Sequence, residues 1–318
     1  MKDMAFARTC FRIITASCLL LSAACSDPNR DVKSILSAAD ALVMSQPEEA
    51  LDILMTIDNH SVKSLNRRDQ SFYNLLRTEA KYKSYLPVAQ DTAIFDVVTY
   101  YQEHGPQDRL ARALVLQGAV YEERNEPTLA MESFKEAEPI IEASGDLENL
   151  GLIHIRIGEI YQHSIINISA AVERYKKALD CFERIDAKKR IASTNLSLAS
   201  ALLIDSLDIA EPYLENGLKS ALELNEQLDI LSGYELYTYL YNRKKEYREI
   251  INIAKHIVST YGECLKNPVE KDLYESILYN CIESFATLGQ IDSARLFASK
   301  LPLVSQSDSL FFYSARVD

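Results

Sequence analysis

The segment DRLARALVLQGAVYEERNEPTLAMESFKEAEPII, residues 108–141, decides the fold because its apolar residues recur with the period of two helices joined by a tight turn. Gly118 lies midway along the first predicted helix, and Tyr121 follows three residues later. The turn Asn125-Glu126-Pro127 leads into a second helix. The buried stripe of this second helix consists of Ala130, Phe134 and Ala137. The pattern predicts one helical hairpin.

Small residues at Gly118 and Ala130 would let the two helix backbones approach closely, while Tyr121 and Phe134 fill the space beside the crossing. A single hairpin cannot bury such a face alone, so several must stack. The same pattern recurs and predicts about seven hairpins. Their boundaries are 31–58, 66–101, 110–141, 147–184, 188–224, 227–258 and 269–301.

One position marks the repeat. The residues that correspond to Ala130 in the other second helices lie 37 to 44 positions apart. They are Ala50, Ala93, Ala171, Ala210, Ile250 and Ala294. The fourth hairpin matches the third most specifically, through Gly158, Tyr161, Ala171, Tyr175 and Ala178, although its turn is one residue longer.

This pattern resembles the tetratricopeptide repeat (TPR), whose usual period is about 34 residues. A period of roughly 40 is similar to the long-helix variants in kinesin light chain, LGN-type scaffolds and bacterial peptide-sensing receptors. The resemblance implies an all-α fold, a right-handed αα-superhelix (TPR-like solenoid). We divide it into N-terminal TPR-like hairpins (31–104) and a TPR solenoid (105–301). Residues 302–318 would form a C-terminal capping helix or a truncated repeat.

Residues 1–24 have the features of a secretory signal peptide, with basic residues ahead of an apolar run from Ile13 to Leu21. The segment Leu21-Ser22-Ala23-Ala24-Cys25 resembles the bacterial lipobox. This resemblance implies that Cys25 carries acyl chains such as palmitate, and that residues 25–30 are a lipidated tether. The chain would then be anchored at the bacterial cell envelope. Ser26, rather than an acidic residue, follows the cysteine, which favours the outer over the inner membrane. The alternatives are a plain signal peptide or a buried apolar helix.

The charge of the chain limits its partners. The net charge is -12, and residues 1–24 carry three basic residues and one acidic residue, so their removal would leave -14. Non-specific nucleic-acid binding requires a basic surface, so we expect no nucleic-acid partner. The acidic excess indicates either solubility alone or a basic partner.

We find no pattern of catalytic or metal-binding residues. The chain lacks HExxH, GxSxG, GxGxxG, CxxC and Walker motifs. His154 and His163 are nine residues apart, which does not place them on one helix face at ligand spacing. We therefore expect no enzyme activity, no cofactor and no metal site. Cys181, Cys264 and Cys281 are predicted to be buried thiols, with a Cys264–Cys281 disulfide as the alternative.

In TPR solenoids the first helix of each hairpin lines a concave groove, and the resemblance therefore implies where a partner would bind. The implied groove residues are Arg112, Glu122, Arg156, Glu159, Gln162, His163, Asn195, Glu235, Tyr239, Asn242, Tyr279 and Glu283. For any single one the alternative is ordinary solvated surface. The Lys/Asn carboxylate clamp of chaperone-binding TPRs is missing, because Val115, Ala119, Ile155 and Glu159 occupy the matching places. An acidic groove favours a neutral or basic peptide.

We expect a non-enzymatic protein–protein interaction scaffold at the bacterial envelope, with an envelope protein or peptide as its partner. Two other interpretations stay open. A SusD-like glycan-binding lipoprotein would stack sugars on exposed aromatic residues, and the absence of Trp weighs against it. The sensor half of a longer TPR membrane regulator would continue beyond Asp318 into an apolar run of about 20 residues.

Overall fold

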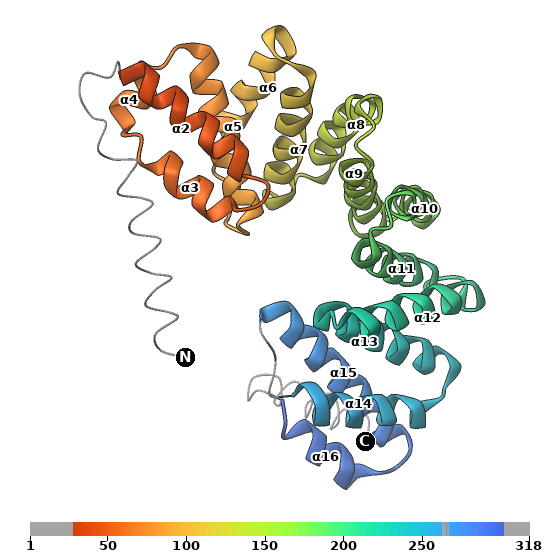
Figure 1. Ribbon diagram of the computed structural model, residues 1–318. Helices are drawn as coiled ribbons and strands as arrows, with labels where there is room; N and C mark the ends of the chain where they lie inside the picture. The colour runs from red at the N-terminus through yellow and green to blue at the C-terminus, as the bar shows by residue number, and fades with distance from the viewer. Residues whose placement is uncertain (1–27, 263–264, 266, 302–318) are drawn as a thin grey trace. The chain divides into compact units, whose positions relative to one another are not determined.

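A computed structural model describes residues 28–262, 265 and 267–301, and throughout these ranges the regular elements are helices (Figure 1). The predictions for the signal peptide, for lipidation at Cys25, for residues 302–318 and for Cys264 lie outside the described residues. Among the described helices, none combines the length and apolar character needed to cross a membrane. The chain divides into two compact units after Ser133, within helix α8 (Pro127–Ser144).

Unit 1 contains the first two predicted hairpins and the start of the third. The first hairpin pairs α2 with α3, the second pairs α5 with α6, and α7 opens the third. A short helix that the sequence pattern did not predict, α4, connects the first two hairpins. The helices are α2 (Pro28–Leu42), α3 (Pro47–Met55), α4 (Asn59–Ser64), α5 (Arg67–Lys83), α6 (Ala93–His104) and α7 (Gln107–Glu123).

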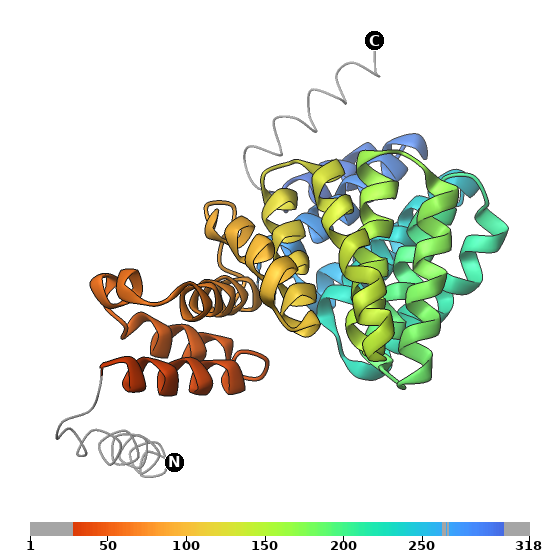
Figure 2. The same cartoon turned by 90° about the horizontal axis from the view of Figure 1, so that it is seen from above.

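Unit 2 contains the remaining hairpins, and its green helices lie side by side as antiparallel pairs in Figure 2. From the fifth hairpin on, each first helix packs on its own second helix and on the preceding one, as TPR-like stacking requires, and the first helix of the fourth hairpin packs on its own second helix. The elements after α8 are α9 (Leu147–Glu159), the π-helical turn η1 (Ile160–Ser164), α10 (Ile168–Arg184), α11 (Lys188–Leu202), α12 (Leu207–Leu224), α13 (Gln227–Lys244), α14 (Tyr247–Tyr261), α15 (Pro268–Thr287) and α16 (Ile291–Ala298).

The repeat-marking position has a structural basis. In six of the seven hairpins the marking residue is the fourth of its second helix and is at most 2% exposed. These residues are Ala50, Ala130, Ala171, Ala210, Ile250 and Ala294. The second hairpin departs from the pattern, because Ala93 is the first residue of α6 and only half-buried, whereas Ile94 and Val97 fill the core.

The departure at Ala93 comes from the loop before α6. Asp91 in this loop is buried and accepts from Arg77 Nη2 at 3.1 Å and from Lys81 Nζ at 2.5 Å. The Glu123 carboxylate of α7 accepts from the backbone N–H groups of Val88 and Ala89, at 2.7 Å each. The loop is therefore fixed by charged side chains, and the apolar pattern does not reveal such contacts.

The turns share one backbone design. In seven connections the residue two places before the next helix has a positive φ, and only two of these residues are glycine. They are Asn125, Gly145, Ile166, Asp186, Asn225, Lys245 and Gly289. In five of the turns the following N–H donates to a carbonyl five residues back, as in a Schellman motif. This hydrogen bond satisfies carbonyls at the end of one helix and redirects the chain into the next.

The fourth hairpin accommodates its longer turn in an unexpected way. The extra residue is absorbed by η1, where the N–H of Ile165 donates to the Ile160 carbonyl, and the N–H of Asn167 then reaches back six residues to Tyr161. The two helices of this hairpin, α9 and α10, cross closely at Gly158. A Cβ added at Gly158 would lie 2.6 Å from Tyr175 Cε1, which confirms the predicted small residue at this crossing.

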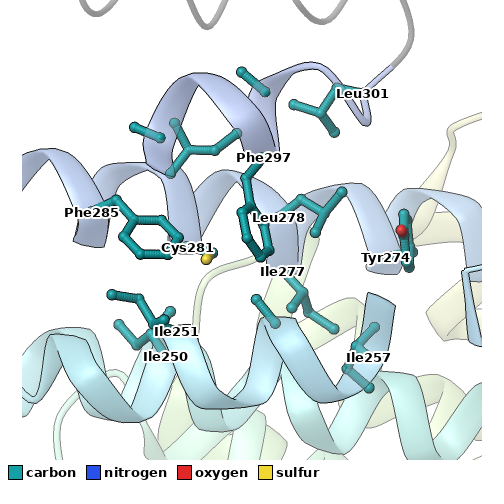
Figure 3. Packing of buried hydrophobic residues seen from close by; sticks show 14 of the residues in the cluster. Ile250, Ile251, Ile257, Tyr274, Ile277, Leu278, Cys281, Phe285, Phe297 and Leu301 are labelled. Carbon is teal, nitrogen blue, oxygen red and sulfur yellow. The ribbon is translucent and has the colours of Figure 1, made fainter. Parts of the chain in front are cut away.

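A large apolar cluster of unit 2 lies among α14, α15 and α16 (Figure 3). Phe285 and Phe297 pack with ring centroids 5.3 Å apart, and Ile250 and Ile257 approach from α14. Cys281 is a buried free thiol within this cluster, and burial raises its pKa to about 12. Cys181 is likewise buried and free.

Candidate functional site

The candidate site is the side of α9, α11, α13 and α15 on which side chains of successive first helices meet. We call this side the first-helix face of unit 2. Along it, neighbouring helices are joined by hydrogen bonds between side chains rather than by apolar packing alone. Gln162 Nε2 donates to Ser200 Oγ at 3.1 Å, between η1 and α11. We call this link, together with the links between α13 and α15 described next, the polar row of the first-helix face.

The same chemistry joins α13 to α15. Ser276 Oγ donates to Glu235 Oε1 at 3.0 Å, and Asn280 Nδ2 donates to Thr238 Oγ1 at 2.7 Å. Thr238 is fully buried and also donates to the Glu235 carbonyl. These bonds satisfy polar groups that would otherwise be buried without partners, so they fix the spacing of the two helices.

Two of the predicted groove residues are buried and form hydrogen bonds inside the solenoid instead. Gln162 and Asn195 are each only 7% exposed. The side-chain oxygen of Gln162, Oε1, accepts from Tyr175 Oη at 2.9 Å. Burial raises the pKa of Tyr175, so its hydroxyl remains a donor. Asn195 donates to the Ile191 carbonyl of its own helix at 2.9 Å. Neither side chain is presented to a ligand in this structure.

Glu235 is the most distinctive group on the face. It is half-buried, and burial raises its pKa above the usual value, an effect that the hydrogen bond from Ser276 partly offsets. In the described part of the chain, no lysine or arginine forms a salt bridge with it. A carboxylate that has lost some of its water in this way is stabilised by a donor or cation from outside.

Several other predicted groove residues are accessible to a ligand. Tyr239 is 41% exposed, and Arg243 Nη1 donates to its hydroxyl at 3.1 Å. Arg156 and Glu159 form an ion pair of 3.3 Å, with side chains 42% and 40% exposed. The other predicted residues of this face divide into the exposed His163, Asn242 and Glu283 and the half-buried Tyr279.

The two predicted residues in unit 1 lie on α7. Glu122 is half-buried near the end of that helix. Arg112 connects three first helices, because its guanidinium pairs with Glu79 of α5 and donates to Asp40 of α2 at 2.9 Å. Burial alone would lower the pKa of Arg112, but the Glu79 and Asp40 carboxylates outweigh it and raise that pKa. Arg112 is therefore a charged structural link.

Sequence reasoning missed the partners in these bonds, namely Ser200, Thr238, Ser276 and Asn280. A positional signal was present, since Thr238 lies three residues after Glu235 and Ser276 three residues before Tyr279. Neutral side chains of this kind are common on helices, so the signal is weak. Over the described ranges, no group of three or more His, Cys, Asp or Glu residues could hold a metal ion.

Comparison with known proteins identifies the fold. The model of the soluble NSF attachment protein (SNAP) family matches residues 82–208. Among curated proteins, no sequence matches the chain significantly.

Three solved structures are similar over most of this chain. A Rap protein complexed with competence and sporulation factor is 15% identical, with a TM-score of 0.61, and the match covers 88% of this chain and 77% of Rap. NprR in complex with its cognate peptide NprX is 15% identical, with a TM-score of 0.61 and coverage of 86% and 78%. A signal transduction ATPase with a tetratricopeptide repeat sensor, from Pyrococcus horikoshii, is 13% identical, with a TM-score of 0.67 and coverage of 91% and 43%. The chain therefore has the predicted all-α fold, a TPR-like helical solenoid.

Proposed function

We propose that this chain is a non-enzymatic interaction scaffold that binds a peptide or an extended protein segment on the first-helix face of unit 2. We further propose that a lipid on Cys25 holds it at the bacterial envelope, where its partner is an envelope protein or peptide. The observation that carries the proposal is the polar row of the first-helix face, with the half-buried Glu235 carboxylate at its centre.

A peptide suits this face for chemical reasons. An extended peptide presents backbone donors and acceptors along its whole length, and it can pair with the accessible polar groups of this face, among them Glu235, Tyr239 and Asn242 on α13. Tyr239 beside Glu235 offers a large side chain with two rotatable bonds, the kind that dominates many binding surfaces. The similar Rap and NprR structures contain a bound factor or peptide, which supports this class of ligand.

The charge of the face favours a neutral or basic segment. Glu235 forms no salt bridge among the described residues, whereas Arg156 is already paired with Glu159. A lysine or arginine of the ligand would gain a charge-assisted hydrogen bond at Glu235 and would relieve the cost of its partial burial.

The binding proposal can be tested with the full chain immobilised on resin. Envelope proteins are digested, captured peptides are identified by mass spectrometry, and one is synthesised for calorimetric titration. We expect Tyr239→Ala and Glu235→Gln each to weaken binding about tenfold. Glu215→Gln, on the exposed side of α12, is the matched control and should bind like the parent chain. Equal affinity for all four chains would refute the site, and capture of glycans in place of peptides would favour the sugar-binding alternative.

The anchor requires a separate test. A bacterial host that expresses the full chain is fed a clickable palmitate analogue, and membranes are separated from soluble protein. Label and membrane association should both be lost in Cys25→Ala and kept in Cys18→Ala. If Cys25→Ala remains labelled, the lipid anchor at this cysteine is wrong.

A further inference from the structure

Unit 1 has an open pocket of about 370 Å³ that belongs to none of the interactions proposed above. Its walls come from α2, α5 and α7, the first helices of three successive hairpins. The volume lies within the range of small-ligand sites in proteins. The lining is mostly polar, and its charged residues are Lys33, Asp40, Arg68, Asp69 and Arg109.

The cations of this pocket are available to a ligand. Lys33 and Arg68 are exposed, and neither forms a salt bridge with any carboxylate in the described part of the chain. Arg109 is held in place because its guanidinium carbon lies 3.6 Å from the centre of the Phe72 ring. Stacking of this kind fixes the plane of the guanidinium. Arg109 also interacts with the Tyr101 hydroxyl, and its remaining N–H groups can bind an anion.

The carboxylates of the pocket, in contrast, already have donors. Asp40 accepts from Arg112 Nη1 at 2.9 Å, and Arg112 also forms a salt bridge with Glu79. Asp69 accepts from Asn66 Nδ2 at 2.8 Å, while its own backbone N–H donates to Asn66 Oδ1 at 3.0 Å. This pair closes the start of α5 as a capping box does. The carboxylates are thus held by Arg112 and Asn66 rather than by the three cations of the lining, and the three cations and two carboxylates of the lining give the pocket a net charge of +1.

The N-terminal ends of α5 and α7 add to the positive electrostatic potential of the pocket. Arg68 is the second residue of α5 and Arg109 the third residue of α7, so the pocket lies beside the first turns of two helices. Helix N-termini carry partial positive charge and favour anions. Side chains and helix dipoles thus agree on the sign of the ligand.

We propose that this pocket is an oxyanion site in which Lys33, Arg68 and Arg109 receive a carboxylate or phosphate group. The site is independent of the first-helix face of unit 2 and has the opposite charge preference. Two arginines and one lysine can surround a group with two or three oxygens, and Arg109 can donate to it with two N–H groups at once.

The experiment is calorimetric titration of the full chain with four probes. These are sodium phosphate, citrate, N-acetyl-tetraglutamate amide and, as a neutral control, N-acetyl-tetraglutamine amide. The test variant is Lys33→Gln/Arg68→Gln, which changes two exposed side chains, and circular dichroism verifies that it is folded. Lys63→Gln on α4 is the matched control, because Lys63 is an exposed lysine outside the pocket.

We expect saturable binding of at least one anionic probe, weakened about tenfold or more in the double variant and unchanged in Lys63→Gln. Binding of phosphate or citrate would identify a small anion as the source of the group, and binding of tetraglutamate alone would identify an acidic peptide. The proposal fails if no anion binds, if tetraglutamine binds equally well, or if the double variant binds like the parent. None of these outcomes depends on Tyr239 or Glu235, so failure here is distinguishable from failure of the peptide site.

Discussion

The first helices of unit 1 and those of unit 2 are joined by different chemistry, although both units repeat the same hairpin. In unit 1 a half-buried guanidinium, that of Arg112, connects α7 to carboxylates on α5 and α2. In unit 2 hydroxyl and amide groups make the corresponding links, and the carboxylates that accept from them belong to Glu235 and Glu270. The repeat therefore constrains small and apolar positions tightly and leaves the polar links between first helices free to vary. The two binding surfaces that we propose have opposite charge preferences.

The largest effect should come from removing the ionic link. Arg112→Ala leaves Glu79, which is 5% exposed, without its partner, so we expect a loss of about 3–5 kcal/mol in the free energy of unfolding. In unit 2, Gln162→Ala orphans the Tyr175 hydroxyl and should cost about 1–3 kcal/mol. Hydrogen exchange resolved by peptide would assign each loss to α2 and α5 or to η1 and α11. Equal losses in the two variants would remove the distinction between ionic and neutral links.

A second prediction concerns a charged cluster of unit 2 formed by Glu138, His154 and Arg174. His154 is 5% exposed, and its Nδ1 lies 3.2 Å from Arg174 Nη1, which can only donate. Burial lowers the pKa of His154 from 6.5 to about 4, while Glu138 acts in the opposite direction and Arg174 and Lys177 reinforce the shift. The folded state thus holds this histidine neutral.

This shift predicts that the folded state loses stability in acid. Because the unfolded chain takes up a proton near pH 6.5 and the folded chain does so only near pH 4, stability is present above pH 6.5 and is lost as pH falls between these values. The loss should reach about 2–3 kcal/mol at pH 4. Thermal melts from pH 7 to pH 4 should show a smaller decline in His154→Gln. An identical decline in both chains would contradict the assignment to His154.

The third prediction tests the part of the repeat that both units share. Gly158→Ala places a methyl group 2.6 Å from the Tyr175 ring, so urea unfolding should show a loss of about 1–3 kcal/mol. Gly145 is the matched glycine, since nothing lies within 4 Å of its would-be Cβ and only its positive φ matters. Gly145→Asn should stay within about 0.5 kcal/mol of the parent, because Asn tolerates that conformation.

The smallest effect is expected at the surface. Arg156 and Glu159 pair at 3.3 Å but are both about two-fifths exposed, so Arg156→Ala should change stability by no more than about 0.5 kcal/mol. This pair lies within one helix, whereas Arg112 binds the buried Glu79 and also Asp40 on two other helices. A loss at Arg156 comparable to that at Arg112 would show that burial is not what separates them.

The fold could be predicted because every hairpin requires the same kind of residue at a few positions. A second helix needs a small or apolar fourth residue to seat on its first helix, and this requirement made Ala130, Ala171 and Ala210 recognisable. Ala93 failed as a marker because charged contacts from Glu123 and Asp91, rather than apolar packing, set the start of α6. Local patterns carry no information about such contacts.

The candidate sites were less predictable for the same reason. Arg112 meets Glu79 and Asp40 across 33 and 72 residues of sequence, and helix periodicity does not specify which exposed charges will face each other at that separation. The buried places of Gln162 and Asn195 were also hidden, because a polar residue on a first helix has the same spacing whether it meets solvent or the next hairpin.

The π-helical turn at Ile160–Ser164 has a consequence for how such chains change over time. One surplus residue is taken up within a single turn, and Ala171 still arrives at the fourth position of α10 with its side chain fully buried. An insertion at the end of a first helix therefore need not shift the packing of anything downstream. Hairpins of this architecture can change in length by one residue and remain interchangeable. Their turns are therefore sites where the binding surface can vary during evolution while the core packing is kept.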